Sequence, residues 1–107
     1  MNNLAKLLKE ATPLLDVLRD EQRQAILLMI LENKELNVNS ITEKSELSRP
    51  PISHHLKLMT QAEVLLVRKQ GVHRFYRMNF DCIMPVMKER YESLAQLQAL
   101  QETPHPE

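Results

Sequence analysis

The chain has little of what builds a covalent scaffold or a bulky core: one cysteine, one glycine, no tryptophan, two phenylalanines and two tyrosines among 107 residues. A single cysteine, Cys82, excludes an intramolecular disulfide framework and fits a reducing, cytoplasmic location. The longest apolar run, residues 25–31, is too short to span a bilayer, and the amino terminus has no signal-peptide core. The sequence therefore predicts one domain, with a core of Leu, Ile and Met and no membrane partner.

The net charge of the whole chain is zero, but the charges are unevenly distributed along it. The chain carries 14 basic and 14 acidic residues. Between Lys44 and Arg77, however, seven Lys and Arg residues stand against only Glu46 and Glu63, which gives this segment a net charge of +5 and leaves −5 for the rest. Such a basic segment suits binding to a phosphate backbone, although a solvated charged face is the ordinary alternative.

Apolar spacing and turn residues divide the chain into short elements. The pattern predicts a first helix interrupted at Pro13, a helix over residues 19–31, an edge strand over 36–39, a helix over 40–45, a helix from 51, a hairpin over 64–78 and a last helix from 80. Asn39 or Ser40 is expected to cap the helix after the strand. Asp81 is expected to cap the last helix and to place Pro85 in its first turn.

Two consecutive prolines occur in the stretch SRPPISHHLKLM, residues 48–59. The first N–H groups of a helix have no intrahelical partner, so prolines there cost no hydrogen bond. Either Ser48 or Pro50 is expected to mark the boundary of the helix. Because a residue before proline avoids the helical region, Arg49 and Pro50 are expected to be extended, with the helix proper starting at Pro51. One face of this helix would then be apolar, and the other would carry Ser53, His54 and Lys57.

The segment VLLVRKQGVHRFYRM, residues 64–78, combines an apolar run, the only glycine at Gln70-Gly71 and two aromatic strand formers. This pattern predicts a β-hairpin with a basic tip. A helix, a tight turn, a second helix and a basic hairpin form a winged helix-turn-helix. The predicted fold class is therefore mainly α with a small β-hairpin wing (α+β), flanked by terminal helices.

The stretches LSRPPISHHLKLM and VRKQGVHRFYRM resemble the ArsR/SmtB family of winged-helix transcriptional repressors, and the resemblance extends over residues 14–80. It implies a recognition helix over residues 50–61 that binds double-stranded DNA together with the wing, and terminal helices that form a homodimer. The residues expected to face DNA are Ser48, Arg49, Pro50, Ser53, His54 and Lys57 on the helix, and Arg68, Lys69, Gln70, His73 and Arg74 on the wing. The residues expected to form the dimer are Leu4, Leu7, Leu8, Ile83, Met84, Met87, Tyr91, Leu94 and Leu97.

The chain departs from the family pattern at three positions. Glu46 and Glu63 stand where the family usually has glycine, and Pro51 replaces a usual Ser or Thr. Glu46 is expected to alter the geometry of the turn before the recognition helix. Pro51 removes a hydroxyl that could contact phosphate or base.

The paired histidines favour DNA contact over metal binding. Adjacent helical residues diverge by about 100°, so His54 and His55 cannot easily chelate one ion. His55 lies nearer the apolar face, which favours packing or a backbone hydrogen bond. His54 shares a face with Ser53 and Lys57, which favours contact with DNA.

The metal sites of the family are expected to be absent. Arsenite-responsive members carry a Cys-x-Cys pair where this chain has Asn37-Val38-Asn39, and an amide is not a soft donor. Zinc-responsive members carry Asp-x-His on the last helix, where residues 81–83 here read Asp-Cys-Ile. A site built from His105 with Glu102 or Glu107 would have too few defined ligands. No cofactor and no metal are expected, and the residues do not identify an effector.

An enzyme would need a nucleophile, a base and an orienting group in one pocket, but Ser53 and the histidines lie on one short helix without an acid nearby. Catalysis is therefore not expected. The predicted function is a dimeric, sequence-specific repressor on an inverted-repeat operator, with residues 1–101 as a single domain and 102–107 as a flexible tail. The alternative is a winged helix that binds only proteins, for which basic clustering on the wing would not be expected.

Overall fold

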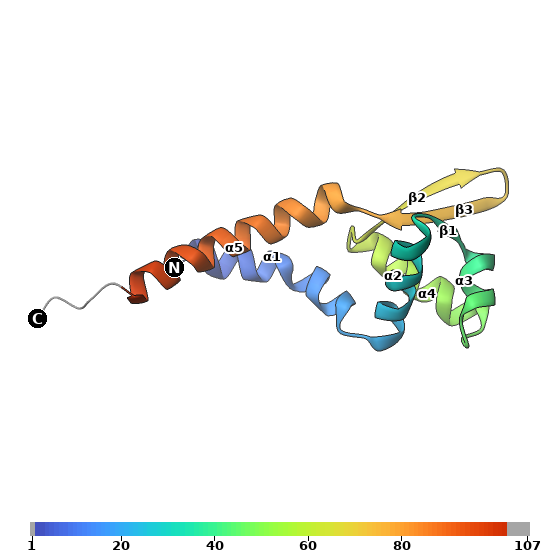
Figure 1. Ribbon diagram of the computed structural model, residues 1–107, viewed down its shortest axis with the longest axis horizontal. Helices are drawn as coiled ribbons and strands as arrows, with labels where there is room; N and C mark the ends of the chain where they lie inside the picture. The colour runs from blue at the N-terminus through green and yellow to red at the C-terminus, as the bar shows by residue number, and fades with distance from the viewer. Residues whose placement is uncertain (1, 103–107) are drawn as a thin grey trace, which may run out of the picture.

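A computed structural model describes residues 2–102, and within them five helices and three strands follow one another. They are α1 (Asn2–Leu18), α2 (Glu21–Asn33), β1 (Leu36–Asn37), α3 (Val38–Lys44), α4 (Arg49–Gln61), β2 (Leu65–Gln70), β3 (His73–Met78) and α5 (Phe80–Glu102). The mainly helical architecture with a small antiparallel sheet confirms the predicted winged helix-turn-helix (Figure 1).

The core lies where α2, α3, α4 and the base of the sheet meet. Helix α4 contributes Ile52, Leu56 and Met59, all fully buried, because the spacing of four and three residues places them on one face. Burying one such side chain is worth about 1.5–3 kcal/mol, so this stripe fixes the helix against the body. The opposite face of α4 is left exposed. The other fully buried large side chains are Ile26, Ile30, Ile41, Val64 and Leu65.

The sheet has the strand order β1-β3-β2 and is antiparallel throughout. Tyr76 of β3 lies between Leu36 of β1 and Val67 of β2. The hairpin turns at Gly71, whose φ of +63° is the left-handed value that favours glycine. A two-residue loop with glycine first matches a type II′ hairpin turn. Beyond β1 the hairpin continues as a two-stranded wing.

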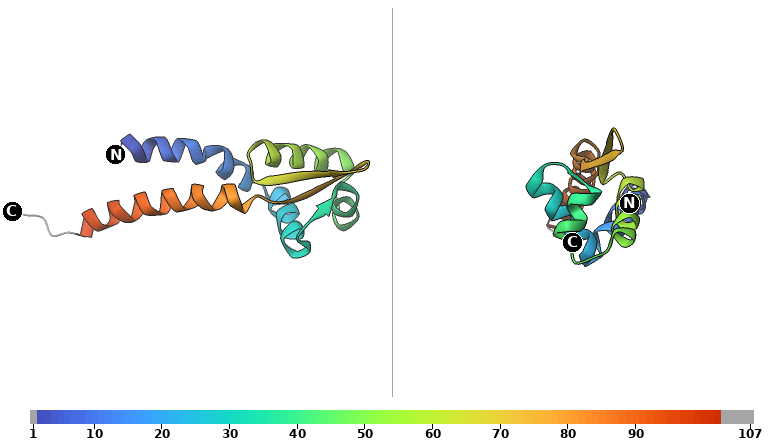
Figure 2. Two further views of the ribbon diagram at one scale, coloured as in Figure 1. Left: turned by 90° about the horizontal axis from the view of Figure 1, so that it is seen from above. Right: turned by 90° about the vertical axis from the view of Figure 1, so that its right-hand side faces the viewer.

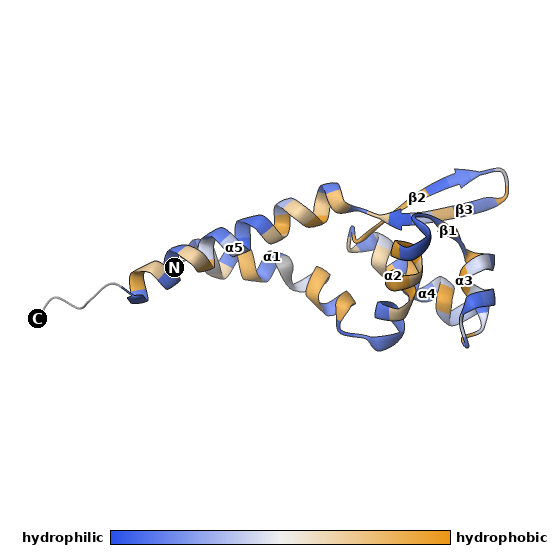
Figure 3. Ribbon diagram, in the orientation of Figure 1, coloured by the Kyte–Doolittle hydropathy of each residue, from blue (hydrophilic) through white to orange (hydrophobic). Residues whose placement is uncertain are grey.

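Helices α1 and α5 run antiparallel, side by side, and project from the winged-helix body (Figures 1 and 2). The molecule measures 66 × 25 × 22 Å with a radius of gyration of 17.9 Å, whereas a compact chain of this length has about 13 Å. Apolar residues continue along both projecting helices (Figure 3). No helix in the described part of the chain is long and apolar enough to cross a membrane.

Three predicted helix starts each differ by two residues from those in the structure. Asp20 caps α2, accepting hydrogen bonds from the N–H groups of Gln22 at 2.7 Å and Arg23 at 3.1 Å. Asn37, not Asn39 or Ser40, caps α3, so the predicted strand is shortened to two residues. The third start is that of α4, where Ser48 takes the extended conformation and Arg49 is already helical.

Both predicted proline boundaries also differ. Helix α1 runs through Pro13 without a break, and the Thr12 hydroxyl donates to the Leu8 carbonyl at 3.2 Å in the preceding turn. Asp81 does not cap α5; the Asn79 carbonyl accepts the first hydrogen bonds, and Pro85 lies inside the helix. Glu102 ends α5, and the rest of the predicted tail lies outside the described residues.

Candidate nucleic-acid interface

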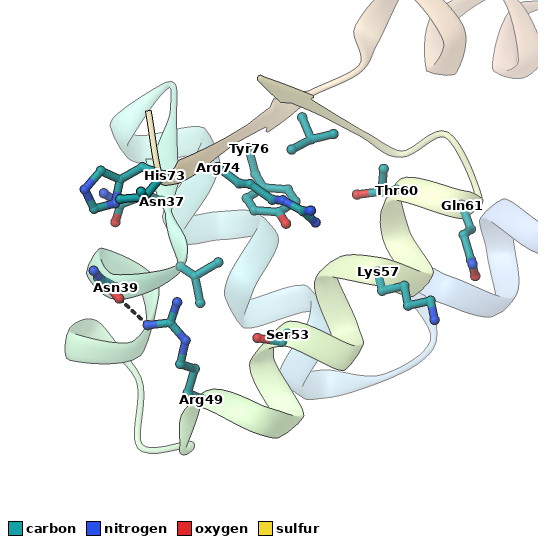
Figure 4. A pocket seen from close by; sticks show the side chains of 13 residues that line it. Asn37, Asn39, Arg49, Ser53, Lys57, Thr60, Gln61, His73, Arg74 and Tyr76 are labelled. Atoms are coloured by element: carbon teal, nitrogen blue, oxygen red, sulfur yellow. Dashed lines mark hydrogen bonds between the residues drawn. The ribbon is translucent and has the colours of Figure 1, made fainter. Parts of the chain in front are cut away.

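An open groove of about 620 Å³ lies between the exposed face of α4, the start of α3 and the wing. Helix α4 lines it with Arg49, Ser53, Lys57, Thr60 and Gln61, and the wing lines it with Val67, Val72, His73, Arg74 and Tyr76 (Figure 4). Asn37, Val38 and Asn39 close its third side. The groove therefore combines a helix face and a hairpin, each carrying basic side chains.

The five α4 residues predicted to face DNA and the N-cap Ser48 are all exposed; the five are Arg49, Pro50, Ser53, His54 and Lys57. Arg49, Ser53 and Lys57 lie in the groove, and the other three lie outside it. The hydroxyl of Ser48 makes no capping hydrogen bond, so it stays available. Sequence reasoning missed Thr60 and Gln61, which extend the same helical face toward the wing by one turn.

The orientation of Arg49 is fixed from α3. Its Nη1 group donates a hydrogen bond to the side-chain oxygen of Asn39, which lies across the groove entrance (Figure 4). Ten residues separate the two in sequence, so no local pattern predicts the contact. It holds the guanidinium at the amino-terminal end of α4, where the residues of a recognition helix that contact base edges are found.

Lys69 and Arg74 are register partners on β2 and β3. Alternation along each strand puts them on the same face as Val67 and Tyr76, which line the groove. Neither cation has an ion pair or hydrogen bond within residues 2–102. Like charges directly opposite each other destabilise a hairpin, so this pair suits a surface that binds an anion.

Arg68 lies on the other face of the wing, where each of its three guanidinium nitrogens donates one hydrogen bond. Its Nε and Nη2 groups donate to the two carboxylate oxygens of Glu35, at 3.3 and 2.6 Å, and its Nη1 group donates to Gln70 at 2.7 Å. The Arg68 hydrogen bond lowers the pKa of Glu35, and the same bond raises the pKa of Arg68. His73, which also borders the groove, packs edge-on against Phe75, with ring centres 6.3 Å apart.

The two histidines of α4 separate as predicted in exposure but not in partner. His54 is exposed, whereas His55 is half-buried with its Nε2 atom 3.2 Å from the Gln22 side-chain oxygen on α2. Of the two alternatives predicted for His55, packing and a backbone hydrogen bond, the half-buried position fits packing, and the polar partner of the ring is an amide side chain. Asp20 lies nearby, and the backbone N–H of Arg23 lowers the pKa of its carboxyl group.

Behind the groove, the junction of α4 and β2 contacts α5. Glu63 has a φ of +62°, the left-handed conformation expected where the family pattern has glycine. The Asn79 side chain donates to the Glu63 carbonyl at 3.1 Å, and the Cys82 thiol donates to its carboxylate at 3.3 Å. That hydrogen bond raises the pKa of Cys82.

Glu46, in the turn between α3 and α4, does not have a left-handed backbone. In that turn the Ser45 hydroxyl accepts a hydrogen bond from the Leu47 N–H at 3.0 Å.

The predicted dimerisation residues fall into two groups. Ile83 and Met87 are half-buried against the chain's own core, and Leu7 and Leu97 are also half-buried. Leu8, Met84, Tyr91 and Leu94 are 47%, 60%, 74% and 51% exposed. Phe80, which sequence reasoning missed, extends the same exposed stripe of α5 and is 48% exposed. The side chain of Leu4 lies outside the described residues.

Nothing in this part of the chain forms a metal centre: among residues 2–102 no three His, Cys, Asp or Glu side chains gather closely enough to hold an ion. His105, the only tail histidine, lies outside the described residues.

A body of three helices, α2, α3 and α4, with a basic exposed face on α4 and a basic wing defines a winged-helix DNA-binding protein. Residues 20–65 match the family model described as bacterial regulatory protein, arsR family. The chain is 34% identical over 73 residues to the arsenical resistance operon repressor of Staphylococcus xylosus, which covers 68% of this chain and 69% of that protein. It is 39% identical over 66 residues to the Escherichia coli protein of the same description, which covers 62% of this chain and 56% of that longer protein.

Among solved structures, reduced HlyU from Vibrio cholerae superimposes with a TM-score of 0.68 and 30% identity over 74% of this chain and 82% of that one. The chain belongs to the ArsR family, and it is a DNA-binding transcriptional regulator rather than a member of an enzyme family.

Proposed function

We propose that the chain is a sequence-specific repressor that binds an inverted-repeat operator as a homodimer, with α4 in the major groove and the wing on the adjacent backbone. The observation that carries the proposal is the groove between α4 and the wing. Lys57 and Arg74 line it without any ion-pair partner within residues 2–102, and Lys69 stands opposite Arg74. Cations left unpaired on a shared surface suit a polyanion.

The proposed DNA contacts are of two kinds, to base edges and to phosphates, according to where each residue lies. Arg49 and His54 lie at the amino-terminal end of α4 and are proposed to contact base edges, together with Ser48, Pro50 and Ser53. Lys57, Lys69, Arg74 and His73 are proposed to contact phosphates, which fix register but carry no sequence information. Arg49 is held for this role by Asn39.

Dimerisation is proposed to occur through the exposed stripe of α5 and the neighbouring face of α1. One apolar stripe of α5 is left about half exposed or more by the chain itself. It consists of Phe80, Met84, Tyr91 and Leu94, whose exposed fractions run from 48% to 74%. An apolar stripe of this length is normally covered in a soluble protein. Two-fold symmetry through it would place two α4 helices about 34 Å apart, one turn of B-DNA. Residues 1–101 would then act as a single domain.

A footprint on the DNA flanking the chain's own gene tests the proposal. We expect two protected half-sites one helical turn apart and an affinity that falls steeply with salt concentration. Lys57→Ala should reduce the steepness of the salt dependence, whereas Lys9→Ala, which removes an exposed lysine of α1 away from the groove, should not. A chain that serves only as a protein-interaction module would give no footprint and no salt-dependent affinity for DNA.

A further inference from the structure

The Arg68 side chain crosses the whole sheet on the face turned away from the groove. Arg68 of β2 lies opposite Phe75 of β3, and Phe75 lies opposite Asn37 of β1. The guanidinium carbon sits 4.8 Å from the centre of the Phe75 ring and reaches Glu35, which precedes β1. One side chain therefore connects the edge strand of the wing to the segment between α2 and the sheet.

The Glu35 end of this connection is itself fixed. Lys34 has a φ of +67°, which turns the chain sharply at the end of α2. The backbone N–H of Glu35 donates to the Asn33 carbonyl at 2.7 Å. The Glu35 side chain is 29% exposed, and its carboxylate accepts both Arg68 hydrogen bonds in the paired geometry that suits a guanidinium.

We propose that Glu35 and Arg68 form a brace that sets the position of the wing, so that Arg68 acts on DNA binding as a positioning residue and not as a phosphate contact. The inference rests on the proposed function. All three guanidinium nitrogens of Arg68 are already donating within the wing and to Glu35. These hydrogen bonds use three of its five N–H groups, and the bound carboxylate offsets its charge, which weakens its attraction for a phosphate.

The wing needs such a brace because little else holds it. Strand β1 pairs only through two residues, so the hairpin beyond Phe75 has two strands, and a two-stranded hairpin is marginally stable alone. Just beyond Arg68 the like charges of Lys69 and Arg74 face each other. The brace therefore acts at the point where the hairpin leaves the body and where the proposed phosphate contacts begin.

The substitution Glu35→Gln separates a brace from a phosphate contact by the sign of its effect. It removes the negative charge that pairs with Arg68 and would release the Arg68 side chain. If Arg68 bound phosphate, operator affinity should therefore rise, and the salt slope should become steeper. The brace predicts the opposite: a several-fold weaker affinity with an unchanged salt slope. Glu32→Gln is the matched control, since it removes an equal charge from the same end of α2 at a residue without an ion pair in residues 2–102.

Two further variants test the pair directly. Arg68→Lys keeps the charge but loses the two-pronged geometry, so it should weaken binding as much as Glu35→Gln. The exchange Glu35→Arg with Arg68→Glu should restore affinity toward the wild-type value, because it rebuilds the pair. Amide hydrogen exchange in β2 should be faster in each single variant and slow again in the exchange variant, which reports wing order independently of DNA.

The outcomes are distinguishable. A wild-type chain that binds no DNA overturns the proposed function. A wild-type chain that binds while Glu35→Gln binds equally or more tightly overturns the brace alone. Arg68→Ala should leave the salt slope unchanged, and a slope lower by about one unit would make Arg68 a phosphate contact.

Discussion

Lys69 and Arg74 face each other directly across the two strands of the wing, on the face that borders the groove. A like-charged cross-strand pair lowers hairpin stability by about 0.2–1 kcal/mol relative to a neutral pair, so an isolated hairpin would disfavour it. When DNA is bound, the two charges are expected to become favourable, because each cation then contacts a phosphate.

The first prediction follows from that pair. Lys69→Ala and Arg74→Ala should each weaken binding to specific and nonspecific duplexes alike and lower the salt slope by about one unit. Each should also leave the free protein equally or slightly more stable to heat, since the repulsion is relieved. Titrations at several salt concentrations measure the slope. Weakening restricted to the operator would show that these residues contact bases.

The second prediction concerns base readout by α4. Arg49→Ala and His54→Ala should reduce discrimination between operator and altered sequences, by about 1–3 kcal/mol for a lost two-pronged base contact. Asn39→Ala should produce a weaker version of the Arg49 effect, because Asn39 only orients the guanidinium. Competition with single-base operator variants measures this. Equal weakening on every sequence would mean that the helix reads no bases.

How far the sequence predicts this molecule depends on the range of each interaction. The winged-helix architecture, the hairpin and its glycine turn follow from local periodicity and turn chemistry, and the structure confirms them. Helix starts were missed where a neighbouring residue supplied a better cap. Asp20 and Asn37 accept hydrogen bonds from the first N–H groups of α2 and α3, and such competition between nearby polar residues is not visible in periodicity.

The site shows the same division. The exposed face of α4 was predictable because its apolar and polar residues alternate at helical spacing. The roles of individual cations were not. Arg68 and Lys69 are adjacent in sequence, yet strand alternation places them on opposite faces, and the partner of Arg68 is 33 residues away. The basic cluster of the sequence is therefore divided by the structure between the groove face, which carries Lys69, and the opposite face, where Arg68 pairs with Glu35.

The third prediction tests the proposed dimer. Leu94→Glu places a charge in the exposed stripe of α5, so it should give monomers in sedimentation and a large loss of operator affinity. Gln96→Glu adds the same charge to the same helix at an exposed polar position and should leave both properties near wild type. A Leu94→Glu monomer that binds the operator as tightly as the wild type would contradict the dimeric arrangement.

The fourth prediction concerns Cys82. The hydrogen bond to the Glu63 carboxylate raises the thiol pKa, because a thiolate would face that negative charge. Ionisation is therefore expected only at pH values above the ordinary cysteine range, and alkylation at neutral pH should be slow. Glu63→Gln should move the pH–rate profile of alkylation to lower pH, since an amide can donate to the thiolate. A profile that stays in place or moves upward would show that Glu63 does not control the thiol.

The last prediction is that zinc, nickel and arsenite do not release the chain from DNA. Within residues 2–102 no group of three or more His, Cys, Asp or Glu side chains is placed to hold an ion. At the position of the family's Cys-x-Cys pair, Asn37 caps α3 and Asn39 orients Arg49, so both amides already have structural roles.

Fluorescence anisotropy of the protein–operator complex, titrated with each metal and then with a chelator, measures release. A double variant, Asn37→Cys with Asn39→Cys, places two thiolates at that position and serves as the control for sensitivity to arsenite. Release of the wild-type chain that His105→Ala or Cys82→Ser abolishes would contradict the prediction and would assign a sensing role to that residue. Release that persists in both variants would instead point to an effect of the metal on the DNA, which the chelator and a duplex-only titration separate from sensing.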